Sequence, residues 1–156
     1  IDIVYNNGNS TVVILDNSIT AMTGHQDNPA TGYTIKGEPA KAVDLVKLCR
    51  AIGVNRMTVA DPFDLKGFEN ILKEELQAEE PSVIIARRPC ALLKGVTYPG
   101  PLEINDNCKS CKMCLKLGCP AISKKGNKII IDPNQCIGCE LCVKVCAFNA
   151  ITPIKK

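Results

Sequence analysis

The chain has 156 residues, a formal net charge of +3 and 46% hydrophobic residues. No apolar run approaches the ~20 residues that span a bilayer, which argues against a membrane protein. Acidic and basic residues are mixed, and no basic stripe with interleaved aromatic residues indicates nucleic-acid binding. The composition changes along the chain: the first hundred residues are cysteine-poor, whereas the last fifty are dense in cysteine and lysine. We therefore expect two small domains.

The first hundred residues predict strands alternating with helices. The expected strands have unbroken or nearly unbroken apolar runs and lie at 11–15, 57–60 and 82–86. The expected helices lie between them, at 38–52 and 66–76. This order indicates right-handed βαβ units with a parallel sheet, and the first strand is expected to be buried on both faces. We predict a partial doubly wound α/β domain over residues 1–98, with further strands upstream or in a partner.

Apolar residues at helical spacing define the expected buried face of each helix. Cys49 belongs to the first face, and we interpret it as a small core residue because it has no partner at ligand spacing. The face of the first helix is Ala42, Val43, Leu45, Val46, Leu48 and Cys49, and that of the second is Phe68, Ile71, Leu72 and Leu76.

A polar loop, residues 17–29, follows the first predicted strand. Ligands of open α/β sheets bind beyond the carboxyl ends of the strands, so this loop is a candidate site. It holds His25, the single histidine, which is either a proton-transfer or substrate-binding group or a surface residue. After the third strand, Arg87 and Arg88 either bind an anion or cap the strand end. Cys90 is either a redox thiol or a buried loop residue.

The last fifty residues contain two cysteine runs. The first is Cys108-x2-Cys111-x2-Cys114-x4-Cys119-Pro120, and the second is Cys136-x2-Cys139-x2-Cys142-x3-Cys146. Zinc and disulfides are the alternatives, but a CxxCxxC triplet differs from the paired knuckles of zinc sites and there is no signal peptide. The spacing is typical of two [4Fe–4S] clusters, in which the fourth cysteine of each run ligates the other cluster.

We therefore assign one cluster to Cys108, Cys111, Cys114 and Cys146, and the other to Cys136, Cys139, Cys142 and Cys119. The fold expected for residues 99–156 is a small α+β two-[4Fe–4S] ferredoxin-like domain that folds around its clusters. The x4 spacing before Cys119 predicts a bulge, and Ala147 in the place of Pro120 predicts a changed turn or potential.

Lysines surround the first run, at positions 109, 112, 116, 124, 125 and 128. They form either a solvated surface or a docking face for an acidic electron carrier, and both interpretations stay open. Iron bound to thiolates, without a targeting signal, indicates a reducing cytoplasm. The chain opens at Ile1 without an initiator Met, so we expect a piece of a longer polypeptide.

The loop sequence LDNSITAMTGHQ, residues 15–26, resembles the second half of the thiamine diphosphate motif of 2-oxoacid:ferredoxin oxidoreductases. Within this superfamily, the large subunits of the indolepyruvate ferredoxin oxidoreductases are most similar. They share the loop, an Asp-Pro pair like Asp61-Pro62, an Arg-Pro-Cys element like residues 88–90, and a C-terminal two-cluster domain. The resemblance covers essentially the whole chain in one order.

The resemblance implies that the cofactor's diphosphate is held through Mg²⁺, with the side chain of Asn17 and the carbonyl of Ile19 as ligands. It implies N–H groups around Thr20, Thr23 and Gly24 for the diphosphate, and His25 as the candidate catalytic residue. No Gly-Asp-Gly, the other half of the motif, occurs in this chain. We expect it upstream or on another chain, so that this fragment alone is inactive.

The activity implied by the resemblance is oxidative decarboxylation of a 2-oxo acid, such as an arylpyruvate, to an acyl-coenzyme A. Its implied partners are a second, beta subunit, coenzyme A, and ferredoxin as the electron acceptor. The alternative is a non-catalytic iron–sulfur electron-transfer module on an α/β scaffold. Binding of thiamine diphosphate by the complete subunit separates the two.

Overall fold

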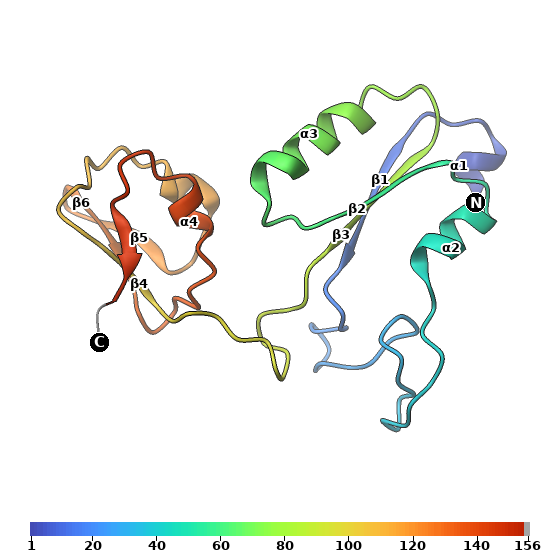
Figure 1. Cartoon of the computed structure of the whole chain (residues 1–156), viewed down its shortest axis with the longest axis horizontal. Coiled ribbons are helices and arrows are strands. Elements are labelled where there is room, and N and C mark those ends of the chain that lie inside the picture. The colour runs from blue at the N-terminus through green and yellow to red at the C-terminus, as the bar shows by residue number, and fades with distance from the viewer. Residues whose placement is uncertain (155–156) are drawn as a thin grey trace. The chain divides into compact units, whose positions relative to one another are not determined.

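The computed structural model describes residues 1–154 and divides the chain into two compact units, residues 1–96 and 97–156. The first unit is built on a parallel three-stranded sheet in the order β1-β3-β2 (Figure 1). Its strands are β1 (Thr11–Asp16), β2 (Arg56–Ala60) and β3 (Ser82–Arg87). Its helices are α1 (Asp2–Tyr5), α2 (Leu45–Ala51) and α3 (Leu65–Glu75), and α3 packs against β2 and β3. The predicted fold class, α/β followed by a small α+β domain, is confirmed.

Burial is concentrated in the central strand. Ile84 and Ile85 of β3 have no exposed surface, and Cys49 packs into one core cluster with Val54 and Ile85. The prediction that Cys49 is a core residue is confirmed. The prediction that the first strand is buried on both faces is wrong, because β1 lies at the edge of the described sheet and its Leu15 is 80% exposed.

The first long helix is shorter than predicted. The helix predicted from residue 38 begins only at Leu45, because the Asp44 carboxylate accepts the N–H groups of Val46 (2.9 Å) and Lys47 (3.1 Å) as an N-cap. The residues before Asp44 bond to the preceding loop and do not form a helical turn. For example, the N–H of Val43 donates to the carbonyl of Pro29 (2.7 Å).

Four residues assigned to buried helix faces are exposed. Ala42 and Val43 precede α2, where the chain is not helical. Leu48 is within α2 but faces away from its core cluster, and Leu76 is the C-cap of α3. The period of the apolar pattern therefore identified each helix and overextended the face of each.

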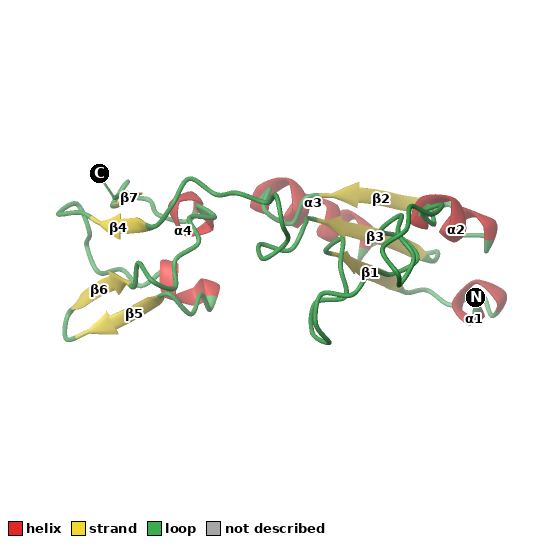
Figure 2. Cartoon of the chain, turned by 90° about the horizontal axis from the view of Figure 1, so that it is seen from below, coloured by secondary structure: helices red, strands yellow, loops and turns green. Residues whose placement is uncertain are grey.

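The second unit contains two short antiparallel ladders (Figure 2). One pairs β4 (Leu102–Ile104) with β7 (Ile151–Pro153), and the other is the hairpin of β5 (Ile122–Lys125) and β6 (Lys128–Ile131). Two single turns of helix complete the unit: the 3-10 turn η1 (Cys114–Leu117) and α4 (Leu141–Lys144). Partly buried cysteines pack directly against a small buried core. The core residues are Leu102, Ile122, Ile129, Cys142 and Ile151.

Across residues 1–154, no helix combines the length and apolar character required to cross a bilayer.

Candidate cofactor sites

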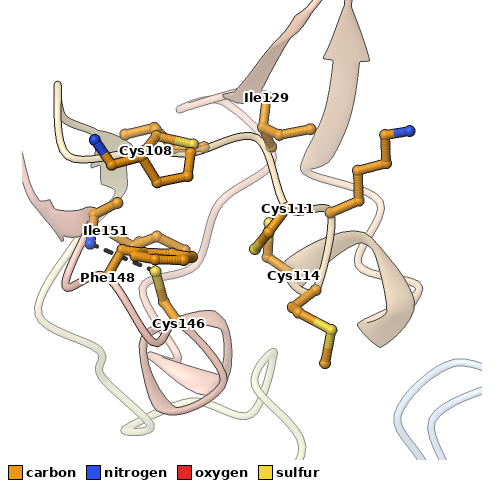
Figure 3. Close-up of a pocket in the computed structure, with 12 residues that line it drawn as sticks. Cys108, Cys111, Cys114, Ile129, Cys146, Phe148 and Ile151 are labelled. Carbon is orange, nitrogen blue, oxygen red and sulfur yellow. Dashed lines mark hydrogen bonds between the residues drawn. The ribbon is translucent and has the colours of Figure 1, made fainter.

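The first candidate site is a pocket in the second unit that is lined by four cysteines (Figure 3). Cys108, Cys111 and Cys114 come from the first run, and Cys146 comes from the end of the second run. The rest of the lining is mainly apolar, from Ile104, Ile129, Met113, Phe148, Ala150 and Ile151, with Lys109 and Lys112. The structure therefore brings together the four cysteines assigned to one cluster.

The second candidate site is a cavity of about 390 Å³ with the complementary set of cysteines. Cys136, Cys139 and Cys142 come from the second run, and Cys119 comes from the end of the first. Each site thus takes three thiols from one run and one from the other. This exchange joins the two runs, because neither site has four cysteines without the other run.

The electrostatics of the thiols follow the same grouping. Burial raises the pKa of the Cys114 thiol, and the neighbouring Cys108, Cys111 and Cys146 add to this effect. Burial raises the pKa of Cys142 to about 11, with smaller contributions from Cys139, Cys136 and Cys119. Both shifts favour the protonated thiols of Cys114 and Cys142 when no iron is bound. Binding iron requires deprotonation and therefore releases protons.

The donor sets fit [4Fe–4S] clusters in kind and number. A [4Fe–4S] cubane spreads its four thiolates over four irons. Four soft sulfur donors around a largely apolar pocket match this requirement.

Corresponding positions in the two CxxCxxC loops have the same backbone conformation. Ser110 (φ 52°) corresponds to Gly138 (φ 76°), and Lys112 (φ 67°) corresponds to Glu140 (φ 62°). All four are in the left-handed region, which curls each loop around its pocket. At position 138 only glycine fits, because a Cβ would overlap the Gly100 carbonyl oxygen.

Backbone N–H groups donate to three of the sulfur atoms. Ser110 donates to Sγ of Cys108 (3.4 Å), Leu102 to Sγ of Cys136 (3.5 Å) and Ala150 to Sγ of Cys146 (3.5 Å; Figure 3). Such bonds stabilise negative charge on sulfur and tune cluster potentials. The extra residue of the x4 spacing is accommodated where η1 ends, at Gly118 (φ 65°).

The third candidate site is the loop after β1, in the first unit. The amide oxygen of Asn17 accepts the N–H of Ile19 (3.2 Å), and Ile19 itself is buried. Thr20 and Gln26 form an antiparallel bridge, with N–H to carbonyl distances of 2.9 and 3.1 Å. The hydroxyl of Thr23 donates to the Gln26 side chain (2.8 Å). The loop is therefore a folded hairpin-like element.

This geometry limits how the loop can bind a diphosphate. The N–H of Thr20 donates to Gln26, and the N–H of Gly24 donates to Ala21 (3.1 Å). A diphosphate bound here must open those bonds or use other N–H groups of the loop. His25 lies beside them, exposed and with a left-handed backbone (φ 59°).

The loop does offer oxygen donors of the kind that Mg²⁺ prefers. An amide oxygen has two lone pairs, and Ile19 uses one pair of Asn17, which leaves one for a cation. Two protein oxygens with phosphate and water oxygens are a common Mg²⁺ environment. The residues present thus fit part of a magnesium diphosphate site.

Ion pairs fix the carboxyl edge of the sheet around this loop. Arg87 of β3 donates to Asp16 (2.7 Å), and Arg88 donates to Asp61 (2.6 Å) while stacking over Phe63 at 3.8 Å. The N–H of Cys90 donates to the carbonyl of Asn17 (2.9 Å). The two arginines therefore cap strand ends, and the segment that follows β3 holds the loop in place through Cys90.

Sequence reasoning missed several contributors to these sites. The apolar lining at Ile129 and Phe148 and the N–H donors to sulfur have no motif of their own. One signal was available in the sequence: when the two cysteine runs are aligned, Ser110 corresponds to Gly138. Because glycine favours positive φ, this pairing indicates a left-handed backbone at that position in both loops.

Two family profiles match the chain. The profile described as "Thiamine pyrophosphate enzyme, C-terminal TPP binding domain" matches residues 1–86, and the one described as "4Fe-4S binding domain" matches residues 128–151. The chain thus joins a thiamine pyrophosphate-binding domain to a 4Fe-4S binding domain. The chain belongs to the thiamine pyrophosphate enzymes, since that profile covers more than half of it.

Individual relatives define the family more narrowly than the profiles do. The chain is 38% identical to "Indolepyruvate oxidoreductase subunit IorA" of Archaeoglobus fulgidus over 99% of its length and 26% of that protein. It is 38% identical to the IorA of Thermococcus kodakarensis and 36% identical to that of Methanothermobacter marburgensis, each over 98% of this chain and 25% of the relative. The chain thus spans about a quarter of the length of these curated relatives.

These matches confirm the resemblance to indolepyruvate ferredoxin oxidoreductases that the loop and cysteine runs carry. They also confirm thiamine diphosphate and iron–sulfur as the types of cofactor.

Proposed function

We propose that the chain is part of a thiamine diphosphate-dependent 2-oxoacid:ferredoxin oxidoreductase that acts on arylpyruvates such as indolepyruvate. The reaction is oxidative decarboxylation to an acyl-coenzyme A, with electrons passing through two [4Fe–4S] clusters to ferredoxin. The enzyme works in the cytoplasm with a second, beta subunit. Residues 1–98 are the C-terminal part of the thiamine domain, and residues 99–156 are the two-cluster domain.

One observation carries this proposal: a single chain joins a thiamine pyrophosphate domain to two pockets, each with four cysteines. Thiamine diphosphate, when bound, supplies the electron sink for loss of CO₂ from a 2-oxo acid, and the clusters supply one-electron acceptors. The names of the relatives support indolepyruvate as the substrate.

The residues of the first unit have distinct roles in this proposal. The amide oxygen of Asn17 and the carbonyl oxygen of Ile19 hold Mg²⁺. Groups of the loop at Thr20, Thr23 and Gly24 hold the diphosphate once the bonds of Thr20 to Gln26 and of Gly24 to Ala21 open. The exposed imidazole of His25 moves a proton at the substrate. The ion pairs of Arg87 and Arg88 keep the strand ends in place beneath the loop.

In the second unit, the first cluster is held by Cys108, Cys111, Cys114 and Cys146, and the second by Cys119, Cys136, Cys139 and Cys142. Apolar side chains line much of both pockets, while the first pocket keeps one exposed ligand, Cys111. The N–H donors at Ser110, Leu102 and Ala150 stabilise charge on three of the sulfur atoms.

The test uses the enzyme purified anaerobically from its native source with every polypeptide that copurifies. We expect indolepyruvate plus coenzyme A to reduce ferredoxin, with pyruvate a much poorer substrate. We expect about eight irons and eight acid-labile sulfides per chain, and EPR signals of two coupled clusters after dithionite reduction.

The matched variants are Asn17→Ala and Asn28→Ala, since both remove an amide from the same loop. Asn17→Ala should abolish 2-oxoacid-dependent reduction while iron content stays the same, and Asn28→Ala should retain most activity. Full cluster content without any 2-oxoacid-dependent reduction would instead identify an electron-transfer module.

A further inference from the structure

Positive charge is distributed unequally between the two cysteine pockets. Lys109 and Lys112 are both exposed and line the first pocket. The second pocket has no lysine among its described lining residues, and Glu140 occupies the position that corresponds to Lys112. The two loops therefore present opposite charges at the same backbone position.

The first loop is tied to a second source of positive charge. The hydroxyl of Ser110 donates to the carbonyl of Asn127 (2.8 Å), which is in the turn between β5 and β6. Three exposed lysines flank that turn. We call the whole set the lysine face: Lys109, Lys112, Lys124, Lys125 and Lys128. Within residues 1–154, the ion pairs involve other cations, so none of these five lysines is paired with a carboxylate there.

The first pocket is also the more accessible of the two. Its ligand Cys111 is exposed, whereas no cysteine of the second pocket is exposed and Cys142 is buried. Two apolar side chains that line the first pocket, Met113 (45% exposed) and Phe148 (41% exposed), are open to solvent. Methionine and aromatic residues are enriched at protein interfaces.

We propose that the lysine face docks an acidic one-electron carrier of the ferredoxin class, and that the cluster of Cys108, Cys111, Cys114 and Cys146 is the electron exit. This inference rests on the proposed function and adds the exit cluster and the docking surface to it. One electron leaves the reduced cluster, which is oxidised, and enters the iron–sulfur cluster of the carrier, which is reduced. No bond or proton is transferred.

Charge complementarity favours this occupant. Unpaired lysines around an exposed cluster attract an acidic carrier over long range and raise the encounter rate by 10- to 1000-fold, approximately. Redox encounters use small, transient interfaces, and the exposed Lys109, Lys112, Met113 and Phe148 at the first pocket provide such a surface. A single-stranded nucleic acid is the weaker candidate. Its bases stack on several aromatic side chains, and the described lining of this pocket has one aromatic residue, Phe148.

The experiment is a charge exchange between the two loops of the full chain with its clusters loaded. The double variant Lys112→Glu/Glu140→Lys keeps the net charge and changes only which loop is positive. The probe is an acidic plant-type [2Fe–2S] ferredoxin, mixed with the dithionite-reduced, desalted chain in a stopped-flow instrument. Lys144→Glu, at the end of α4 and outside both cysteine loops, is the control, and Lys109→Gln/Lys112→Gln is a milder second variant.

We expect the exchange variant to reduce the probe about tenfold more slowly at low ionic strength, and the control to change the rate by less than about twofold. The difference should vanish near 1 M salt, where charges are screened within about 3 Å. Equal slowing in the control, or no slowing in either lysine variant, overturns the inference.

The two proposals fail separately. Iron analysis and EPR of every variant come first. A chain that lacks two clusters defeats the proposed function, and the inference with it. A chain with both clusters that reduces the probe independently of the lysine face defeats only the inference.

Discussion

The two cysteine loops share a backbone and differ in what surrounds it. Residues 110 and 138, and residues 112 and 140, have the same left-handed conformation. The first loop is open, basic and tied to a hairpin turn by Ser110, whereas the second is closed by the Gly100 carbonyl against Gly138. Spacing therefore sets the ligand geometry, while the residues between the ligands set access and charge.

The largest effect tests whether the loops share their ligands. In Cys146→Ala we expect iron to fall from about eight to about four per chain, because the first pocket loses its fourth thiolate. The remaining EPR signal should match that of Cys111→Ala. Cys119→Ala should lose the other signal and match Cys139→Ala. If Cys146→Ala matches Cys139→Ala, each run keeps its own fourth ligand.

The second test concerns the closed loop without iron. Burial and neighbouring thiols raise the pKa of Cys142 to about 11, from 9.0. Near pH 8, iodoacetamide should therefore alkylate Cys142 about 100-fold more slowly in the folded iron-free chain than in denaturant. The folded state keeps a proton that the unfolded state loses, so this stabilisation is present below pH 9 and disappears as pH rises from 9 to about 11.

Mass spectrometry of digests measures the modified fraction, with the exposed Cys111 as the control thiol. Equal rates at Cys142 in both states would mean that the second loop is open before iron binds.

The third test substitutes alanine at the corresponding loop positions. Gly138→Ala should destabilise the chain by at least about 2 kcal/mol, because the new Cβ overlaps the Gly100 carbonyl at a left-handed position. Ser110→Ala removes only an exposed hydrogen bond to Asn127 and should destabilise it by about 1 kcal/mol or less. Denaturant midpoints, followed by cluster absorbance, rank the two. The reverse order would contradict the contrast between a closed and an open loop.

The smallest effect tests the charge difference. Lys112→Gln removes a cation and should lower the potential of the first cluster, whereas Glu140→Gln should raise that of the second. For a solvent-screened charge about 8 Å away, each shift is about 0.5 kcal/mol, or on the order of 20 mV. Redox titration followed by EPR measures both. Shifts of the same sign would refute a local charge effect.

What the sequence predicted well is local or strictly periodic. The two CxxCxxC spacings define their own ligand sets, and β-branched runs located the three parallel strands to within a residue. The start of α2 was missed because the decisive contact is long-range: Val43 donates to Pro29, and only then does Asp44 cap the helix. The helical spacing of apolar residues carries no information about such loop contacts.

The candidate thiamine loop shows the same limit. Its motif identifies Asn17 and the residues after it, but not that Thr20 bonds Gln26 across the loop. The edge position of β1, and thus the exposure of Leu15, depends on strand order, which one strand's composition does not encode.

The exchange of fourth cysteines also has a consequence for the order of biosynthesis. The second pocket has its complete set of thiols once residue 142 has been made, whereas the first pocket lacks a ligand until residue 146. Beyond it, β7 (Ile151–Pro153) then pairs with β4. During synthesis the second pocket can therefore assemble its ligands before the first pocket can. A chain truncated after any residue from 142 to 145 would keep all four cysteines of the second pocket and lack one ligand of the first.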